Sequence, residues 1–555
     1  MSPGTVGLLF EDGAIYTLDA GRPQADALAV SGDRIIAVGR RDELRAAYPG
    51  WRRRSLEGRA VLPAFTDGHI HLAAYGLSLS SINLRDCRSL REAVDRVAAA
   101  AARARPGEWI RGGRWDKNLW PEGRFPRRED LDPVTADRPA ALSSKDGHTM
   151  WVNSAALHRA GIGAATPDPP GGRIARDPRT GEPTGLLVEE AQAVMRAVAG
   201  RPAPEELDAA ILQGAAALHR AGIAAVHVME DAAVLAAVQR LRARGALALR
   251  VCMMLPEDGL EAAIRIGIQS GLGDAMIRIG GVKIFADGAL GSQTASMLEP
   301  YEGDPENLGV TVRSRQQLRD VIGRAASAGI AAVVHAIGDR ANRWVLDAIE
   351  AARAEEPALP GGRKLRHRIE HAQLIHPDDL PRFARLGVVA SMQPIHCTQD
   401  RDIADRYWGR RSRYAYPWRS LIGSGAHLAF GSDAPVETAD VMAGIHAAVT
   451  RTRREERGRG AWYAEEALTV EEAIRAYTVG PAYASGEEGS KGVLAPGRVA
   501  DFVVLSRDPF SAPPEALGDI RAELTVVGGE VCYDASSGSN ASDSSSSANA
   551  ERSTG

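Results

Sequence analysis

Cysteine is scarce in this chain. The 555 residues include four cysteines, Cys87, Cys252, Cys397 and Cys532, and each stands far from the others. Such isolated cysteines exclude a disulfide-rich scaffold and a zinc site built from closely spaced cysteine pairs. Unpaired thiols fit the reducing cytoplasm, so we expect a cytoplasmic protein.

The chain also lacks a strong net charge and a long apolar run. Its formal net charge is −4, which argues against a nucleic-acid partner. No uninterrupted apolar stretch approaches the roughly 20 residues that cross a bilayer. The first twenty residues carry Glu11, Asp12 and Asp19 and have no basic start followed by an apolar core. We therefore expect no membrane partner and no secretory signal, although another export route stays open.

The amino-acid composition is that of an ordinary globular protein. Hydrophobic residues make up 44% of the chain and charged residues 25%, as in soluble folded proteins. The length allows one large domain with insertions, or two or three domains. The end of the chain, residues 536–555, is rich in serine, asparagine and alanine, and we expect it to be disordered and to have no role in catalysis.

A His-x-His pair is the most informative short motif. His69 and His71 follow the apolar stretch of residues 60–65. On a strand, residues two apart point to the same side, so both imidazoles could reach one metal ion. Two histidines in a surface turn are the alternative, and the motif alone does not decide between the two.

Four later apolar runs also end in residues that bind metals or react. They end in Lys283, His335, His371 and Asp433. A random surface does not place such residue types at strand ends in this way. Neutral imidazoles with a carboxylate suit zinc or a similar divalent ion. A lysine joins such a set only as a carbamate, formed with CO₂, whose two oxygens can bridge two ions that activate one hydroxide.

The alternation of strands and helices predicts an α/β fold, a (β/α)₈ TIM barrel. In such a barrel, catalytic residues sit at the carboxyl ends of the strands, which would bring these six side chains to one mouth. The eight strands are expected near residues 60–66, 223–229, 247–254, 279–285, 331–335, 367–371, 388–393 and 427–431.

Two further parts are expected around the barrel of residues 59–489. Short strands at both chain ends, residues 1–58 and 490–535, should meet in one composite β-sandwich, with Gly528-Gly529 as a hairpin turn. The gap after the first barrel strand is too long for a simple crossover. We interpret residues 75–205 as an inserted subdomain that could form a lid or a pocket wall.

These motifs together resemble the amidohydrolase superfamily, and within it the YtcJ-like branch of the amidohydro-3 type. The superfamily pattern is His-x-His after strand 1, Lys after strand 4, His after strands 5 and 6, and Asp after strand 8. All of these positions are filled here. The branch-level matches are Val282-Lys283-Ile284-Phe285-Ala286-Asp287-Gly288, His335-Ala336-Ile337-Gly338-Asp339, Ile369-Glu370-His371-Ala372, Ser391-Met392-Gln393-Pro394 and Gly431-Ser432-Asp433-Ala434-Pro435.

The resemblance implies a role for each of these residues. His69, His71 and Asp433 would bind one divalent ion and His335 with His371 a second, zinc being the expected metal. Carboxylated Lys283 would bridge the two ions. Asp433 would also be the catalytic residue, which takes a proton from the bridging water and passes it to the leaving amine.

Five other residues are candidates for the substrate pocket, each with a structural alternative. His148 lies in the insertion, and a substrate contact and a structural role are equally open. Trp115 and Asp116 could line the pocket or simply pack the insertion. His227, at the end of strand 2, could line the pocket or support a ligand, and His396, after strand 7, could face the substrate.

The leading functional hypothesis is a metal-dependent hydrolase that uses a metal-activated hydroxide on a small-molecule substrate. The bond would be a non-peptide carbon–nitrogen bond, in an amide, formamide, carbamate or cyclic amide. Ester or lactone hydrolysis at the same site is one alternative. A catalytically silent regulatory or binding protein on this fold is another. A homodimer is an open expectation for the assembly.

Overall fold

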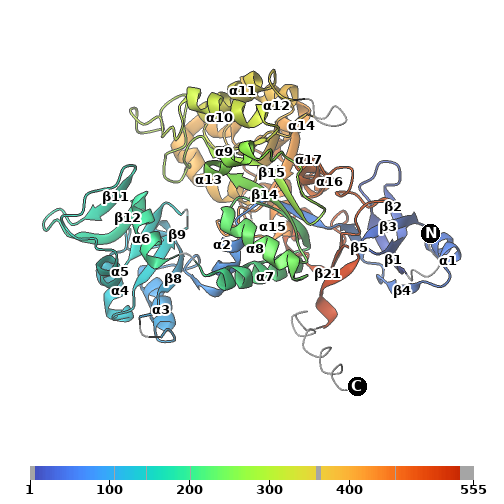
Figure 1. The fold of residues 1–555 in the computed structure, drawn as a ribbon, viewed down its shortest axis with the longest axis horizontal. Helices are drawn as coiled ribbons and strands as arrows, with labels where there is room; N and C mark the ends of the chain where they lie inside the picture. The colour runs from blue at the N-terminus through green and yellow to red at the C-terminus, as the bar shows by residue number, and fades with distance from the viewer. Residues whose placement is uncertain are drawn as a thin grey trace. The chain divides into compact units, whose positions relative to one another are not determined.

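Eight parallel strands form the central sheet, and each pairs with the next in chain order. Figure 1 shows these strands surrounded by helices. They are β6 (Phe65–Ile70), β13 (Ile223–Val228), β14 (Arg250–Pro256), β15 (Ile277–Phe285), β16 (Ala332–Ala336), β17 (Arg368–His371), β18 (Val389–Met392) and β19 (His427–Phe430). Residues of β13 are buried at every position, as expected for a strand covered on both faces. The predicted (β/α)₈ architecture is confirmed.

The computed structural model describes residues 7–105, 107–145, 147–200, 202–357, 364–456 and 458–537. Of the predicted disordered tail, residues 538–555 lie outside this description, and Ala535–Ser537 form a 3₁₀ turn. Within the described ranges, no helix has the length and apolar character needed to cross a membrane.

Helices follow the barrel strands and cover their outer faces. The helices of this part of the chain are α7 (Pro204–Arg220), α8 (Ala232–Ala243), α9 (Leu260–Arg265), α10 (Arg315–Ser327), α11 (Asp339–Ala352), α12 (Leu380–Leu386), α13 (Pro394–Trp408), α14 (Trp418–Gly423), α15 (Val441–Thr450), α16 (Val470–Ala476) and α17 (Val479–Ala484). Amphipathic sequences explain them. In α10, for example, Ser314 caps the first turn and Leu318, Val321 and Ile322 are buried.

The start of the barrel differs from the prediction. The apolar run at residues 60–66 is divided between two sheets, because β5 (Ala60–Pro63) pairs with strands of the chain ends. The first barrel strand, β6, begins at Phe65. Apolar periodicity cannot reveal this division, since both halves of the run are buried.

Both chain ends meet in one continuous mixed sheet, which confirms that they share a β unit. Its order is β22-β21-β20-β5-β1-β2-β3, and β4 pairs with β1. The strands are β1 (Leu8–Tyr16), β2 (Gln24–Ser31), β3 (Arg34–Gly39), β4 (Arg52–Ser55), β5, β20 (Phe502–Leu505), β21 (Ala522–Val527) and β22 (Glu530–Asp534), with helix α1 (Arg41–Ala47) beside them. Phe10 from one chain end packs edge-on against Phe502 from the other, with ring centroids 4.7 Å apart.

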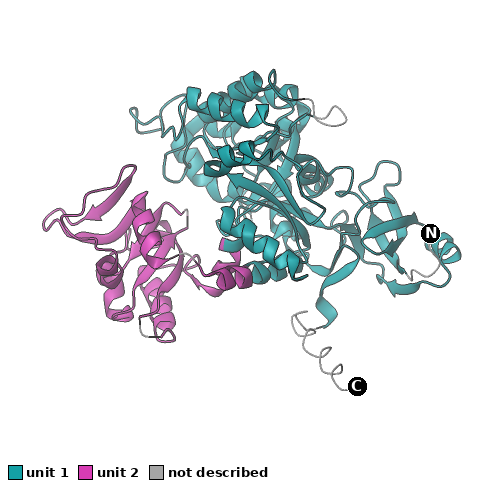
Figure 2. Ribbon diagram, in the orientation of Figure 1, with its two compact units in different colours: residues 1–73, 211–555 teal, residues 74–210 magenta. Residues whose placement is uncertain are grey.

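The insertion after the first barrel strand forms a compact unit of its own, residues 74–210 (Figure 2). Helix α2 (Leu72–Ser80) leads into it from β6. Its six-stranded sheet has the order β11-β12-β10-β9-β8-β7. The elements are β7 (Ile82–Asn83), α3 (Leu90–Ala101), β8 (Ile110–Trp115), α4 (Arg128–Thr135), β9 (Ala140–Ser144), β10 (Thr149–Val152), α5 (Ser154–Arg159), β11 (Gly172–Arg176), β12 (Pro183–Glu189) and α6 (Ala191–Ala199).

Candidate metal centre

The seam between the first and last barrel strands is built around one buried carboxylate. Asp67 on β6 accepts hydrogen bonds from the backbone N–H of Ser432 at 2.9 Å, from that of His69 at 3.1 Å and from the Ser432 hydroxyl at 2.5 Å. The Asp433 N–H donates to the His69 carbonyl across the same seam at 2.7 Å. These bonds stand in for a strand ladder between β6 and β19 and fix the backbone of two predicted ligands.

Two glycines allow this close approach. A Cβ atom on Gly431 would lie 2.3 Å from the backbone nitrogen of His69, and one on Gly68 would lie 2.7 Å from the Phe430 carbonyl oxygen. Neither distance is possible for a real side chain. The seam therefore requires glycine on both strands.

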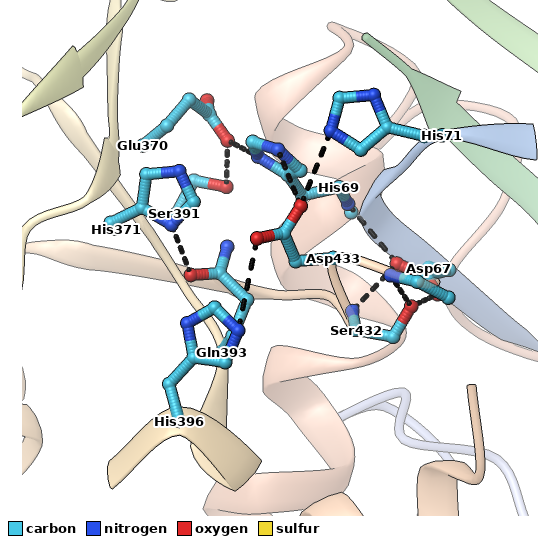
Figure 3. Close-up of polar contacts among 12 residues, drawn as sticks. Asp67, His69, His71, Glu370, His371, Ser391, Gln393, His396, Ser432 and Asp433 are labelled. Atoms are coloured by element: carbon cyan, nitrogen blue, oxygen red, sulfur yellow. Dashed lines mark hydrogen bonds and ion pairs between the residues drawn. The ribbon is translucent and has the colours of Figure 1, made fainter. Parts of the chain in front are cut away.

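The side chains at this mouth converge on Asp433 (Figure 3). Its Oδ1 lies 3.4 Å from His69 Nε2 and 3.3 Å from His71 Nε2. One ligand atom from each of His69, His371 and Asp433 lies within 4.8 Å of the others, and all three residues are buried. Two imidazole nitrogens and a carboxylate at this spacing could hold a divalent ion.

Hydrogen bonds fix the orientation of three of the imidazoles. His69 Nδ1 lies 2.5 Å from Glu370, His371 Nδ1 lies 2.8 Å from Gln393 Oε1, and His335 Nε2 lies 2.9 Å from the Gly288 carbonyl. Because a carbonyl or carboxylate oxygen only accepts, each of these nitrogens carries the ring's proton. The remaining nitrogen keeps its lone pair, which is what a metal ligand needs.

The electrostatics of His69, His335 and Asp433 favour the form of each group that can bind a metal. Burial lowers the pKa of His69 to about 4 and that of His335 to about 3, so both rings are neutral at physiological pH. Burial alone would raise the pKa of Asp433, but the neighbouring rings of His69 and His371 hold it well below its usual range. These three groups therefore offer two neutral imidazoles and an ionised carboxylate. His71 differs: burial acts to lower its pKa, but its contact with Asp433 outweighs burial and raises that pKa.

Lys283 is buried in the barrel mouth without a hydrogen-bond partner for its Nζ. Burial lowers the pKa of its ammonium group to about 8. The Phe285 ring lies 4.9 Å from Nζ. An amine that gives up its proton this readily can react with CO₂ to form a carbamate.

Several supporting residues were not assigned a role from the sequence. Asp287 is buried, and burial raises its pKa to about 7. It accepts from the N–H groups of Ile337 and Gly338 at 3.0 and 2.9 Å and lies 3.6 Å from His335 Nε2. Glu370 and Gln393 hold ligand rings as described above. Asp287 and Glu370 each share a motif with a predicted ligand, which was their signal in the sequence, whereas the motif of Gln393 contains no predicted ligand.

His227 and His396 lie in the barrel. His396, near the start of α13, is buried and its Nε2 has no hydrogen-bond partner. That atom lies 3.7 Å from Asp433 Oδ2, and the ring stacks on His371 with centroids 6.0 Å apart. His227 is fully buried on β13, and its Nδ1 lies 2.8 Å from Arg368 Nη1. His396 therefore lies beside Asp433, whereas His227 contacts Arg368.

The three candidates in the insertion have structural contacts within it. Trp115 is buried in the core of that unit, and its Nε1 donates to the Leu142 carbonyl at 2.8 Å. Asp116 caps a 3₁₀ turn by accepting from the Asn118 N–H at 2.9 Å. His148 Nδ1 lies 3.0 Å from the Glu189 carboxylate. The packing alternative accounts for Trp115 and Asp116, and a substrate contact stays a prediction for all three.

Comparison with protein-family models gives one match over most of the chain. The model described as amidohydrolase family, Amidohydro_3, matches residues 54–533. This chain belongs to the amidohydrolase family. A model of an imidazolonepropionase-like composite domain from bacteria also matches residues 27–50, within the sheet of the chain ends.

Relatives of this amidohydrolase cover nearly the whole chain. The Bacillus subtilis (strain 168) protein YtcJ, provisionally named an amidohydrolase, is 33% identical over 95% of this chain and 99% of its own. The N-substituted formamide deformylase of Arthrobacter pascens is 29% identical over 95% of this chain and 98% of its own. A solved metal-dependent hydrolase from Pyrococcus horikoshii OT3, itself uncharacterised, is 29% identical over 92% of this chain and 99% of its own, with a TM-score of 0.77.

A metal ion, on which the Pyrococcus hydrolase depends by its name, also fits the residues of this chain. The fit rests on the converging donor atoms of His69, His371 and Asp433 and on the buried, unpartnered amine of Lys283. An unpaired buried polar atom is costly unless something completes it.

Proposed function

We propose that this amidohydrolase cleaves a non-peptide carbon–nitrogen bond in a small molecule, with a divalent metal centre at the barrel mouth. The observation that carries the proposal is the convergence of His69, His371 and Asp433 at the carboxyl ends of three barrel strands. Amides, formamides, carbamates and cyclic amides are the substrate classes. The deformylase relative acts, by its name, on N-substituted formamides, which places that class first for testing.

The donors divide into two sets. His69, His71 and Asp433 would hold one ion, and His335 with His371 a second. Carboxylated Lys283 would bridge the two, and zinc suits the donor types. When bound, such ions supply Lewis acidity to a carbonyl group and lower the pKa of a coordinated water.

The chain's own residues supply the proton transfers. Asp433, ionised and held among imidazoles, can accept a proton at its carboxylate and deliver it to the departing nitrogen. His396 Nε2 is buried without a hydrogen-bond partner, 3.7 Å from Asp433 Oδ2, and would donate or accept a hydrogen bond with the substrate beside that carboxylate. The positions of His69 and His371 are fixed by Glu370 and Gln393, so the donors need no rearrangement.

Two alternatives use the same fold. An ester or lactone carbonyl could be attacked at the same site, because the metal chemistry does not depend on the leaving atom. A catalytically silent regulatory protein would have no need for the full ligand set, and here every ligand position of the family pattern is filled. A homodimer and a cytoplasmic location stay predictions.

A substrate panel tests the proposal. Purified protein supplied with zinc would be assayed against N-substituted formamides, N-acyl amines, carbamates, cyclic amides and matched esters. We expect turnover of at least one carbon–nitrogen class, and loss of that turnover in His371→Ala. Turnover of esters alone would favour the first alternative. No turnover by a zinc-loaded protein across the whole panel would favour the second.

A further inference from the structure

A charged cluster lies inside the barrel behind the metal centre. Arg368 is 1% exposed, and Glu370, Ser391 and His227 are 0% exposed. Arg368 and Glu370 stand two residues apart on β17, so both point to the same side of the strand. This cluster includes none of the predicted metal ligands.

The guanidinium of Arg368 ties these groups together. Its Nε donates to Glu370 Oε1, and its Nη2 lies 3.1 Å from Glu370 Oε2 and 2.7 Å from Ser391 Oγ. The Ser391 hydroxyl donates to Glu370 Oε2 at 2.8 Å. On the other side, Nη1 donates to His227 Nδ1 at 2.8 Å. The planar fork of arginine suits such a set of fixed acceptors.

Two bonds connect the cluster to the His-x-His ligand pair. Glu370 Oε2 accepts from His69 Nδ1 at 2.5 Å, which directs the His69 lone pair at Nε2 toward Asp433. Arg368 Nη2 also donates to the carbonyl of Gly68 at 2.6 Å, one residue before that ligand. Arg368 therefore restrains both the side chain of His69, through Glu370, and its backbone.

Stability alone is a poor explanation for this arrangement. Removing two charges from water costs about as much as their attraction returns, and apolar replacements of buried ion pairs are often neutral or stabilising. A carboxylate on the far nitrogen of a ligand histidine, by contrast, fixes its tautomer and strengthens metal binding.

We infer that Arg368 is a positioning residue of the metal centre. It orients the Glu370 carboxylate, and Glu370 in turn fixes the tautomer and rotamer of His69. The inference rests on the metal centre of the proposed function and is independent of the bond that is cleaved. His227 holds the opposite side of Arg368, which gives this residue a supporting role and not a substrate contact.

Zinc affinity of the whole chain, measured by competition with a chromogenic chelator, tests the inference. Glu370→Gln keeps the shape but can present an N–H to His69, and we expect about 10–100-fold weaker zinc binding. Arg368→Met alone would leave a buried unpaired carboxylate and could fail to fold. The double variant Arg368→Met/Glu370→Leu removes both charges, so we expect a folded protein with a similar loss of affinity.

A second buried pair provides the matched control. Arg250 and Asp501 form a two-bond ion pair, at 2.6 and 2.8 Å, between β14 and the sheet of the chain ends. Arg250→Met/Asp501→Leu should change thermal unfolding of the zinc-free protein but leave zinc affinity within about twofold.

Unchanged zinc affinity in Glu370→Gln and in the folded double variant would overturn the inference, as would a wild-type chain that binds no zinc. If the variants bind zinc more weakly but the wild-type chain hydrolyses none of the panel compounds, the inference is supported and the proposed reaction is contradicted.

Discussion

At the scale of single residues, Asp433 joins the two histidines of the first strand and a third beside them. Its Oδ1 lies within 3.4 Å of His69 Nε2 and His71 Nε2, and its Oδ2 lies 3.7 Å from His396 Nε2. A carboxylate in this position can bind metal and still move a proton. Substitution by asparagine separates the two functions, because the amide keeps the shape and one ligand oxygen but cannot accept a proton.

We expect Asp433→Asn to lower the turnover rate by at least about a hundredfold, as loss of a positioned general base does. Metal content and thermal unfolding should change little, since the barrel core does not depend on this mouth residue. Turnover, metal content and unfolding would be measured together. Near-normal turnover with metal retained would transfer the proton role to another group, and His396 would be the next to test.

The amine of Lys283 raises a different question at the same scale, because its proposed function requires a carbamate and not a positive charge. Arginine keeps the charge but forms no carbamate, so Lys283→Arg should lose both metal and activity. Lys283→Ala should behave likewise, and a short added carboxylic acid should partly restore both by occupying the bridging position. The measurements are metal ions per chain and turnover. An active Lys283→Arg enzyme would refute the bridging role.

At the scale of elements, the sequence predicted the ligands better than their supports. His69, His335, His371 and Asp433 stood out because reactive residue types ended apolar runs. Arg368 did not, because a charged residue in a strand is usually taken to face solvent. Only the folded barrel shows that this residue and Glu370 both point into the interior, where they form an ion pair.

Most barrel strands were also predictable from the sequence. Seven barrel strands lie close to their expected positions, whereas the first was placed too early because β5 and β6 share one apolar run. At the start of the chain, where short strands were expected, one longer strand forms, β1, whose register shifts between Glu11 and Ile15. Pairing partners decide both cases, and local sequence carries little information about them.

The seam between β6 and β19 gives a prediction at this scale. Gly431→Ala would place a methyl carbon 2.3 Å from the His69 backbone nitrogen. The strands must separate, so we expect a loss of about 1–3 kcal/mol of stability together with weakened zinc binding. Thermal unfolding and chelator competition measure the two effects.

Gly423→Ala, in α14, is the control for this substitution, because nothing lies within 4 Å of its added carbon. It should be neutral or slightly stabilising, since alanine favours a helix. Equal behaviour of the two variants would show that the seam tolerates the extra carbon.

At the scale of the whole molecule, the barrel is joined to the sheet of the chain ends by buried polar groups. Arg250 and Asp501 form one such connection. His219, in the last turn of α7, lies at another: its carbonyl accepts from the Thr525 hydroxyl on β21 at 2.7 Å. Its ring is 5% exposed, and its Nε2 has no hydrogen-bond partner.

This buried ring makes the junction sensitive to acid. Burial lowers the pKa of His219 from 6.5 to about 4. Above pH 6.5 the ring is neutral in the folded and the unfolded chain, so it has no effect on stability. As the pH falls from 6.5 toward 4, the unfolded chain binds a proton that the folded chain refuses, and stability is lost. By about pH 5 the loss from this one group is about 2 kcal/mol.

His219→Gln removes the titrating group from the junction. Whatever its stability at pH 7.5, we expect the variant to gain about 2 kcal/mol relative to the wild type when both are moved to pH 5. Urea unfolding of the two proteins at each pH, without added metal, measures the difference. Metal-free protein is needed because the histidines of the metal centre would otherwise lose their ion over the same range. If the unfolding free energies of the two proteins change equally with pH, a local opening must expose the ring of His219 to water while the barrel and the end sheet are still joined.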